Sequence, residues 1–331
     1  MASSIQIGRT VDDISTYTAE ERKVLDLFYP LMMDRLDGIG PHGRFVHYSS
    51  ADAAMSILTN KEVWLRNTTC MNDFSEVEHG IEALVETYSS PIGQEFQRLL
   101  NSNLADVCKE VETIFNSHLD GLRYKSYIIC VSEHRASEDI TGRLSMWRAY
   151  GATAGVALVM KAAIFRSKTN HLGAYSTPIR YADKSSLTGE FTRIVDGFGQ
   201  NIELLKALGR EKVRDHLFNM FKWAALSIRH PGFVEELEWR VVHSPTLETS
   251  KVLEPAIRVI RGTPQKVYRL PLRTYEGGFS TAIPDLIDRL IIGPTDYPLA
   301  MQEAFIDLLR DAGVQNPEQR VVVSDIPLRA H

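Results

Sequence analysis

The feature that most constrains the fold is the scatter of short apolar runs around two long helical stretches. Apolar residues recur at helical spacing over residues 76–122 and again over 187–228. Short runs with strand-like composition lie at 44–49, 63–65, 127–132, 155–160, 179–181, 239–242, 266–272 and 290–293. This irregular order does not fit a doubly wound parallel sheet. It predicts an α+β fold: a mixed, mostly antiparallel sheet core with two helical insertions and an N-terminal helix.

The two ends of the chain show helix signals. Thr18 and Glu21 form a capping-box pattern at the start of an N-terminal helix, and Pro30 predicts a kink or break within it. A helix over 299–312 and a strand over 320–323 close the chain in a βαβ-like pattern. We therefore expect residues 1–43 to be a polar segment with a helix, and residues 44–331 to be one catalytic-like domain.

Charge, hydropathy and cysteine content limit which partners and which cell compartment we expect for the protein. The 37 basic and 42 acidic residues give a net charge of -5, so no global field attracts nucleic acid, although a local basic cleft remains compatible with it. No apolar run approaches the roughly 18 residues of a membrane span, and the first ten residues lack the apolar stretch of a secretory signal. Cys70, Cys108 and Cys130 give neither a complete disulfide framework nor a CxxC pair. We expect a cytoplasmic protein, with Cys130 a buried, unreactive thiol.

Two polar clusters lie early in the sheet region. Strand alternation turns His47 and Ser49 to one face and Tyr48 to the other. His47 can bind a ligand hydroxyl, or it can be a partly buried structural residue beside a helix-capping serine. Asn72 and Asp73 precede the first helical stretch, where they can cap the helix or form an anion-binding loop with its amide donors.

A third cluster begins where an apolar strand ends at Ser132. The polar segment that follows contains Arg143, Trp147 and Tyr150. Loops held on a rigid sheet are common places for functional sites. The i, i+3 spacing of Trp147 and Tyr150 equally suits a packing contact within a short helix.

The fourth cluster pairs two carboxylates. Glu236 and Glu238 are two residues apart, so in an extended chain both point to the same side, while Leu237 and Trp239 face the core. Like charges this close raise one pKa, as in acid–base sites. The other interpretation is a charged, solvent-facing sheet edge. Arg240 follows directly, and the aromatic and basic neighbours favour a site.

Taken in order, these clusters resemble the bacterial domain-of-unknown-function family 2971 (DUF2971). The resemblance is carried by His47-Tyr48, Asn72-Asp73 with Glu76, Cys130-x-Ser132, Met146-Trp147 with Tyr150, and Glu236-x-Glu238-x-Arg240. It covers about residues 44–330. The chain departs from the family pattern at Phe74, where a proline is usual, and at Ala149, where a histidine is usual.

The same order of residues is also similar to the ADP-ribosyltransferase fold. In that superfamily a first-strand His or Arg holds NAD, a middle-strand Ser or Tyr supports it, and a late Glu acts on the nicotinamide ribose. The resemblance implies His47 as the first ligand and Ser132 as the second. It implies Glu238 as the catalytic carboxylate, with Glu236 as its partner, stabilising an oxocarbenium-like ribose.

The remaining roles are implied less directly. Tyr48, Trp147 or Tyr150 would pack on nicotinamide, and Arg143, Arg148 or Arg240 would hold the diphosphate. NAD would be a co-substrate, no metal would be needed, and an unidentified macromolecule would be the acceptor. Such an enzyme could be a bacterial toxin or defence effector.

Two other functions fit the same residues. One is a hydrolase of nucleotides or nucleic acid that uses the carboxylates and His47, with or without a divalent metal. The other is a non-catalytic module that binds a nucleotide or a protein. A chelator separates the first from NAD cleavage, which needs no metal, and a binding isotherm without turnover identifies the second.

Overall fold

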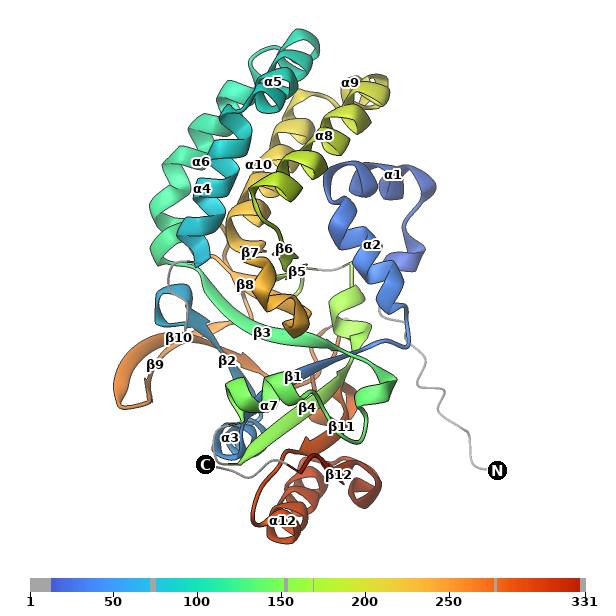
Figure 1. The fold of residues 1–331 in the computed structure, drawn as a ribbon, viewed down its shortest axis with the longest axis vertical. Helices are drawn as coiled ribbons and strands as arrows, with labels where there is room; N and C mark the ends of the chain where they lie inside the picture. The colour runs from blue at the N-terminus through green and yellow to red at the C-terminus, as the bar shows by residue number, and fades with distance from the viewer. Residues whose placement is uncertain (1–12, 72–75, 152–153, 169, 277–278, 328–331) are drawn as a thin grey trace.

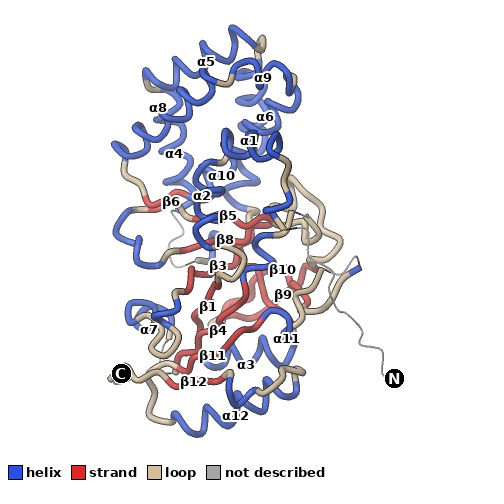
Figure 2. Tube along the Cα trace, turned by 90° about the vertical axis from the view of Figure 1, so that its right-hand side faces the viewer, coloured by secondary structure: helices blue, strands red, loops and turns tan. Residues whose placement is uncertain are grey.

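The computed structural model describes residues 13–71, 76–151, 154–168, 170–276 and 279–327. Within these residues, ten strands form one sheet in which every pair is antiparallel except β11 with β12. Figure 2 shows this sheet across the middle of the molecule, with a lobe of helices above it and α3 (Ala51–Asn60) and α12 (Pro298–Asp311) below. The predicted α+β class, with a mixed and mostly antiparallel sheet, is confirmed.

The N-terminal segment folds as the sequence predicts. The Thr18 hydroxyl accepts from the Glu21 amide and the Glu21 carboxylate accepts from the Thr18 amide, which starts α1 (Ala19–Phe28). The helix is interrupted at Tyr29, and Pro30 begins α2 (Pro30–Ile39). Proline suits the first position of a helix because its missing N–H has no partner there.

The central strands are built around β3 (Tyr127–His134). Its partners are β1 (Arg44–Ser50), β2 (Glu62–Asn67) and β8 (Glu238–His243). The sheet continues through β4 (Gly155–Lys161), β11 (Ile287–Ile292) and β12 (Val321–Val323) beyond β1, through β10 (Thr263–Pro271) and β9 (Glu254–Ile260) beyond β2, and through β5 (Tyr175–Pro178) beyond β8. Figure 1 shows β3 as a long curved strand between the two halves of the molecule.

The residue pairing between strands shows that the two edges of β3 have different partners. Ser132 lies opposite both Val46 of β1 and Glu238 of β8, and Tyr127 lies opposite both Asn67 of β2 and His243 of β8. A strand has only two edges, so β1 and β2 share one edge of β3 and β8 takes the other. The stretch of β3 between its pairings with β1 and β2 is left open on that edge.

Both helical insertions contribute to one lobe. The first comprises α4 (Glu76–Ser89), α5 (Pro91–Asn103) and α6 (Val107–Tyr124), and the second comprises α8 (Lys184–Gln200), α9 (Ile202–Leu208) and α10 (Arg210–Ser227). Phe96 of the first insertion packs against Phe198 of the second, with ring centroids 5.4 Å apart. Phe28 of α1 packs on Phe198 at a centroid distance of 5.0 Å. Because the faces of these helices bury one another in one apolar cluster, neither insertion is an isolated hairpin.

Short elements connect the lobe to the sheet. After α10 come β7 (Ile228–Arg229), paired with β6 (Arg180–Tyr181) in a small parallel sheet, and a 3-10 helix at Pro231–Glu236. The helices α7 (Leu144–Tyr150) and α11 (Ile283–Leu286) lie elsewhere against the main sheet. None of the helices in the described part of the chain has both the length and the apolar character that crossing a membrane requires.

Candidate functional site

The open edge of β3 forms one wall of a cavity. β1 and β2 diverge there, and α3 joins them, so the cavity is enclosed by two strands, a helix and β3. Its volume is about 550 Å³, within the range of small-molecule sites. The lining side chains include His47, Tyr48, Ser49, Trp64, Arg66, Cys130, Ser132, Tyr150, Arg229, Glu236, Glu238, Arg240 and Arg261.

Two carboxylates share one arginine in this cavity. Arg229 Nη1 lies 2.5 Å from Glu236 Oε2 and 2.7 Å from Glu238 Oε2. Arg240 Nε donates to the other oxygen of Glu238 at 2.8 Å. Both oxygens of Glu238 are therefore ion-paired, and the residue is only 4% exposed.

The backbone around this pair differs from the sequence prediction. The prediction placed Glu236 and Glu238 on one extended segment, but Glu236 ends a 3-10 helix and Leu237 has a left-handed conformation with φ of 46°. The carboxylates still converge, because Arg229 lies between them and binds both. The common cation thus replaces strand alternation as the reason that they face the same side.

The environments of the two carboxylates displace their pKa values in opposite directions. Burial would raise the pKa of Glu238, but the charge and hydrogen bond of Arg240, with Arg229 and the Cys130 thiol, hold it below the usual value. Burial raises the pKa of Glu236, and the charge of Glu238 adds to this despite opposing contributions from Arg229 and Tyr150. Such divergence is typical of carboxylate pairs that divide ionic and proton-transfer roles.

His47 lies at the open edge of β3, where it contacts the backbone of Cys130. Its Nδ1 lies 2.9 Å from the Cys130 carbonyl oxygen, which can only accept, so Nδ1 carries the proton. Burial lowers the pKa of His47, and the hydrogen bond to the carbonyl opposes this. The neutral ring therefore has Nε2 as a hydrogen-bond acceptor.

Three hydroxyl-bearing residues of the cavity already have local partners. Tyr150 donates to Glu236 Oε2 at 3.3 Å, and Ser49 donates to the Ser50 carbonyl at the same distance. Tyr48 accepts from the Arg143 amide at 2.9 Å, and burial raises its pKa to about 12. Ser132 is buried on β3 directly opposite Glu238. These four residues, taken from the first and third polar clusters of the sequence, therefore line one cavity.

Arg143 and Trp147 do not line the cavity, which corrects their assignment as ligand-binding residues. Arg143 pairs with Glu138 and donates to the carbonyl oxygens of Glu133, Glu235 and Glu236. Its donors therefore hold the backbone of the Glu236 segment and are not available to a diphosphate.

Trp147 belongs to the core. It is 3% exposed and packs edge-on against Tyr48 at a centroid distance of 4.8 Å, while its indole N–H donates to the Thr141 carbonyl. Burial of the whole ring leaves no face for nicotinamide. Asn72 and Asp73, the other predicted binding residues, lie outside the described residues.

The structure adds cavity residues to which the sequence analysis gave no binding or catalytic role. Arg229 is the most central, and its only sequence signal is a position close before the two glutamates. Arg66 has a buried Nε without a hydrogen-bond partner among the described residues. Cys130, expected to be sealed in the core, is partly exposed and hydrogen-bonded to Glu238. Arg261 comes from a hairpin tip that no local pattern connects to the cavity.

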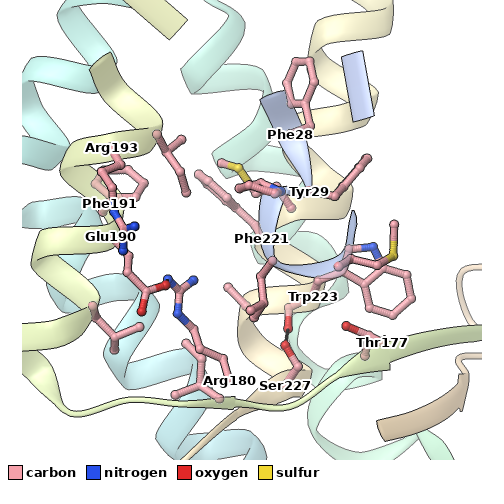
Figure 3. A pocket seen from close by; sticks show the side chains of 18 of the residues that line it. Phe28, Tyr29, Thr177, Arg180, Glu190, Phe191, Arg193, Phe221, Trp223 and Ser227 are labelled. Atoms are coloured by element: carbon pink, nitrogen blue, oxygen red, sulfur yellow. Dashed lines mark hydrogen bonds and ion pairs between the residues drawn. The ribbon is translucent and has the colours of Figure 1, made fainter. Parts of the chain in front are cut away.

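A second cavity of about 450 Å³ lies between the helical lobe and α1–α2 (Figure 3). Its walls are mainly apolar, with Phe28, Phe191 and Phe221 among them. Arg180 and Glu190 form an ion pair at its side. The described residues that line it include Asp26, Asp34 and Glu190, but no histidine and no two carboxylates that share an arginine, so the first cavity is the candidate site.

In the comparison with known proteins, one family model matches part of the chain. Neither the curated proteins nor the solved structures gave a match. The matched segment is shorter than the 44–330 range suggested by the scattered motifs, but it contains Tyr150, Arg229, Glu236, Glu238 and Arg240. Residues 146–241 match the family DUF2971, described as protein of unknown function, which confirms the family resemblance over this segment.

Proposed function

We propose that the chain is an NAD-using ADP-ribosyltransferase or NAD-cleaving enzyme. The observation that carries this proposal is the pair Glu236 and Glu238, bridged by Arg229, with pKa values displaced in opposite directions in one cavity. His47, Ser132 and Glu238 lie on the three neighbouring strands β1, β3 and β8. That order supports the ADP-ribosyltransferase-like arrangement.

The two carboxylates suit different steps of N-glycosidic cleavage. The bond between ribose C1′ and the nicotinamide nitrogen breaks, and nicotinamide leaves with the electron pair. Glu238, kept ionised by its arginines, would stabilise the positive charge that develops on the ribose. Glu236 would accept the proton of the water or acceptor group that adds to C1′, since a raised pKa makes it the stronger base.

The other cavity residues suit the rest of the dinucleotide. His47 Nε2 can accept a hydrogen bond from a ribose hydroxyl. The unused Nε donor of Arg66, with Arg261 at the cavity mouth, suits the diphosphate. Trp64 and Tyr150 supply aromatic surface for a planar ring. We place this activity in the cytoplasm, where it would act as a toxin or defence effector by consuming NAD or modifying a macromolecule.

Nicotinamide release from NAD tests the proposal. We expect release by the wild-type chain with or without a chelator, and loss of release in Glu238→Gln and Glu236→Gln. Glu254→Gln, which removes a carboxylate exposed on β9, is the control that keeps full activity. Circular dichroism of each variant checks that the fold is retained. Absence of release in the wild type, or wild-type activity in both cavity variants, would contradict the proposal.

A non-catalytic nucleotide-binding module is the second candidate. The observation that favours it is the complete ion pairing of Glu238, because a carboxylate engaged by Arg229 and Arg240 can serve structure alone. Calorimetric binding of NAD without nicotinamide release would support this function. Release that stops when a chelator is added would point instead to metal-assisted nucleotide hydrolysis.

A further inference from the structure

The β9–β10 hairpin extends beyond the strand that anchors it. β10 pairs with β2 only over Val267–Pro271, whereas β9 and β10 pair with each other as far as Ile260 and Thr263. Arg261 and Gly262 form the two-residue tip, both with positive φ, as a type I′ hairpin turn requires. The distal part is therefore a two-stranded ribbon, visible in Figure 1 as the orange arm that projects from the sheet.

This segment concentrates positive charge in an acidic chain. Residues 251–273 contain six basic residues and one acidic residue, Glu254, which gives a local charge of +5 against -5 for the whole protein. The basic residues are Lys251, Arg258, Arg261, Lys266, Arg269 and Arg273. A local field of this kind attracts a polyanion even when the net charge of the protein does not.

Ion pairing leaves most of these cations available. Arg258 and Arg269 are within salt-bridge distance of Glu62, and Arg269 also pairs with Glu254. Lys251, Arg261, Lys266 and Arg273 are exposed, and none has an ion pair with a carboxylate among the described residues. Lys266 and Arg273 lie over the rings of Tyr268 and Tyr275, which leaves their charges unneutralised. Exposed cations without a carboxylate partner are the groups that contact phosphates.

The length of the ribbon indicates a polymer as the ligand. Ile260 and Arg261 at its tip line the candidate cavity, while the opposite end of β9 lies at Glu254. At about 3.3 Å per residue these ends are roughly 20 Å apart. One diphosphate cannot contact cations spread over that distance, whereas a nucleic-acid backbone presents a phosphate at every nucleotide.

We propose that the β9–β10 ribbon binds the phosphate backbone of nucleic acid and holds a strand at the mouth of the cavity. A two-stranded ribbon can also enter the major groove of a duplex. Nucleic acid would then be the acceptor in the transfer reaction, and this acceptor role rests on the proposed function. The binding itself does not depend on NAD chemistry.

Fluorescence anisotropy with labelled single-stranded and duplex oligonucleotides tests the proposal. We expect wild-type binding to weaken by about tenfold or more between about 50 and 200 mM salt, as release of counterions from several phosphates requires. The double variant Lys251→Glu/Lys266→Glu lies outside the cavity lining. It should bind at least about tenfold more weakly and show a smaller dependence on salt.

The matched control is Lys206→Glu/Lys212→Glu, which changes the net charge equally but on α9 and α10. Equal loss of binding in this control, or no binding by the wild type, would overturn the proposal. Binding of polyglutamate as tight as that of the oligonucleotides would also overturn it, in favour of an acidic protein partner.

Nicotinamide release from NAD, measured without oligonucleotide, separates the two proposals. Release without oligonucleotide binding contradicts only the ribbon proposal. Oligonucleotide binding without release contradicts only the proposed function.

Discussion

Glu236 and Glu238 have the same chemistry and share a cation, yet their surroundings give them different acid strengths. Glu238 has an arginine on each oxygen, and these charges outweigh the cost of burial. Glu236 shares only Arg229, so burial and the neighbouring negative charge dominate. The difference between the two residues therefore depends on Arg240.

The raised pKa of Glu236 predicts a pH dependence. A base works when deprotonated, so nicotinamide release should fall on acidification at a pH above 4.5, the ordinary carboxyl value. Glu236→Gln should lower the rate by roughly 10²–10⁴ and remove this acidic limb. The pH profile of kcat provides the measurement. Glu235→Gln is the neighbouring control, because within the described residues Glu235 is hydrogen-bonded through its backbone carbonyl and not through its side chain. An unchanged acidic limb in Glu236→Gln would contradict the assignment.

The ion pairs of Glu238 predict a loss of stability on neutralisation. Glutamine keeps the shape of glutamate, so the sequence alone predicts little loss of stability, but Glu238→Gln removes a buried counterion of both Arg229 and Arg240, and Arg229 keeps Glu236. We expect a loss of about 3–5 kcal/mol of unfolding free energy in urea. Glu254→Gln, at an exposed pair, should cost at most about 1 kcal/mol. Equal effects would show that the buried network contributes little.

The sign of the pH effect follows from the lowered pKa of Glu238. Its stabilising contribution is complete above the pKa in the unfolded chain and is lost as pH falls through the lower pKa in the folded protein. Wild type and Glu238→Gln should therefore approach each other in stability at acid pH.

At the scale of elements, α7 supports the site from beneath. Its Trp147 ring lies against Gly142 and Gly293, where an added Cβ would come within 2.6 Å and 2.8 Å of ring atoms. The same helix presents Tyr150 to the cavity. One turn of helix thus separates a packing residue from a cavity-lining residue, which explains why i, i+3 spacing could not distinguish the two positions.

Replacing the two aromatic residues should separate these roles. Trp147→Ala should cost about 3–5 kcal/mol of stability, the range for a large buried ring, with NAD affinity unchanged in the folded protein. Tyr150→Phe should barely alter the melting temperature, but it removes the hydroxyl that donates to Glu236 and should reduce turnover. Melting curves and NAD titrations on both variants provide the measurements. A large fall in NAD affinity for Trp147→Ala would return Trp147 to the site.

At the scale of the whole molecule, one strand connects the site to both halves. β3 carries β8 on one edge and both β1 and β2 on the other, so the cavity forms where the sheet diverges. The helical lobe supplies Arg229, the last residue of β7, which follows α10 directly. Residues more than 180 positions apart, His47 and Glu238, consequently line one cavity.

The sequence by itself determined the class of the fold and most of its elements. These elements depend on local signals, namely apolar periodicity, the capping box at Thr18 and the break at Pro30. Such signals involve residues close in sequence, so they can be recognised without the tertiary structure. The same patterns identified His47, Ser132, Glu236 and Glu238 as unusual polar residues. They did not identify β9, whose mostly exposed residues lack the apolar pattern of a core strand.

Only the tertiary structure decided which residues work together. Arg143 and Arg229 look alike in sequence, yet one holds backbone carbonyls and the other bridges two carboxylates. Trp147 and Tyr150 are likewise separated only by which side of α7 meets the core. Partner choice, burial and pKa depend on contacts between residues far apart in the chain. Those contacts form only when β1, β2 and β8 assemble around β3.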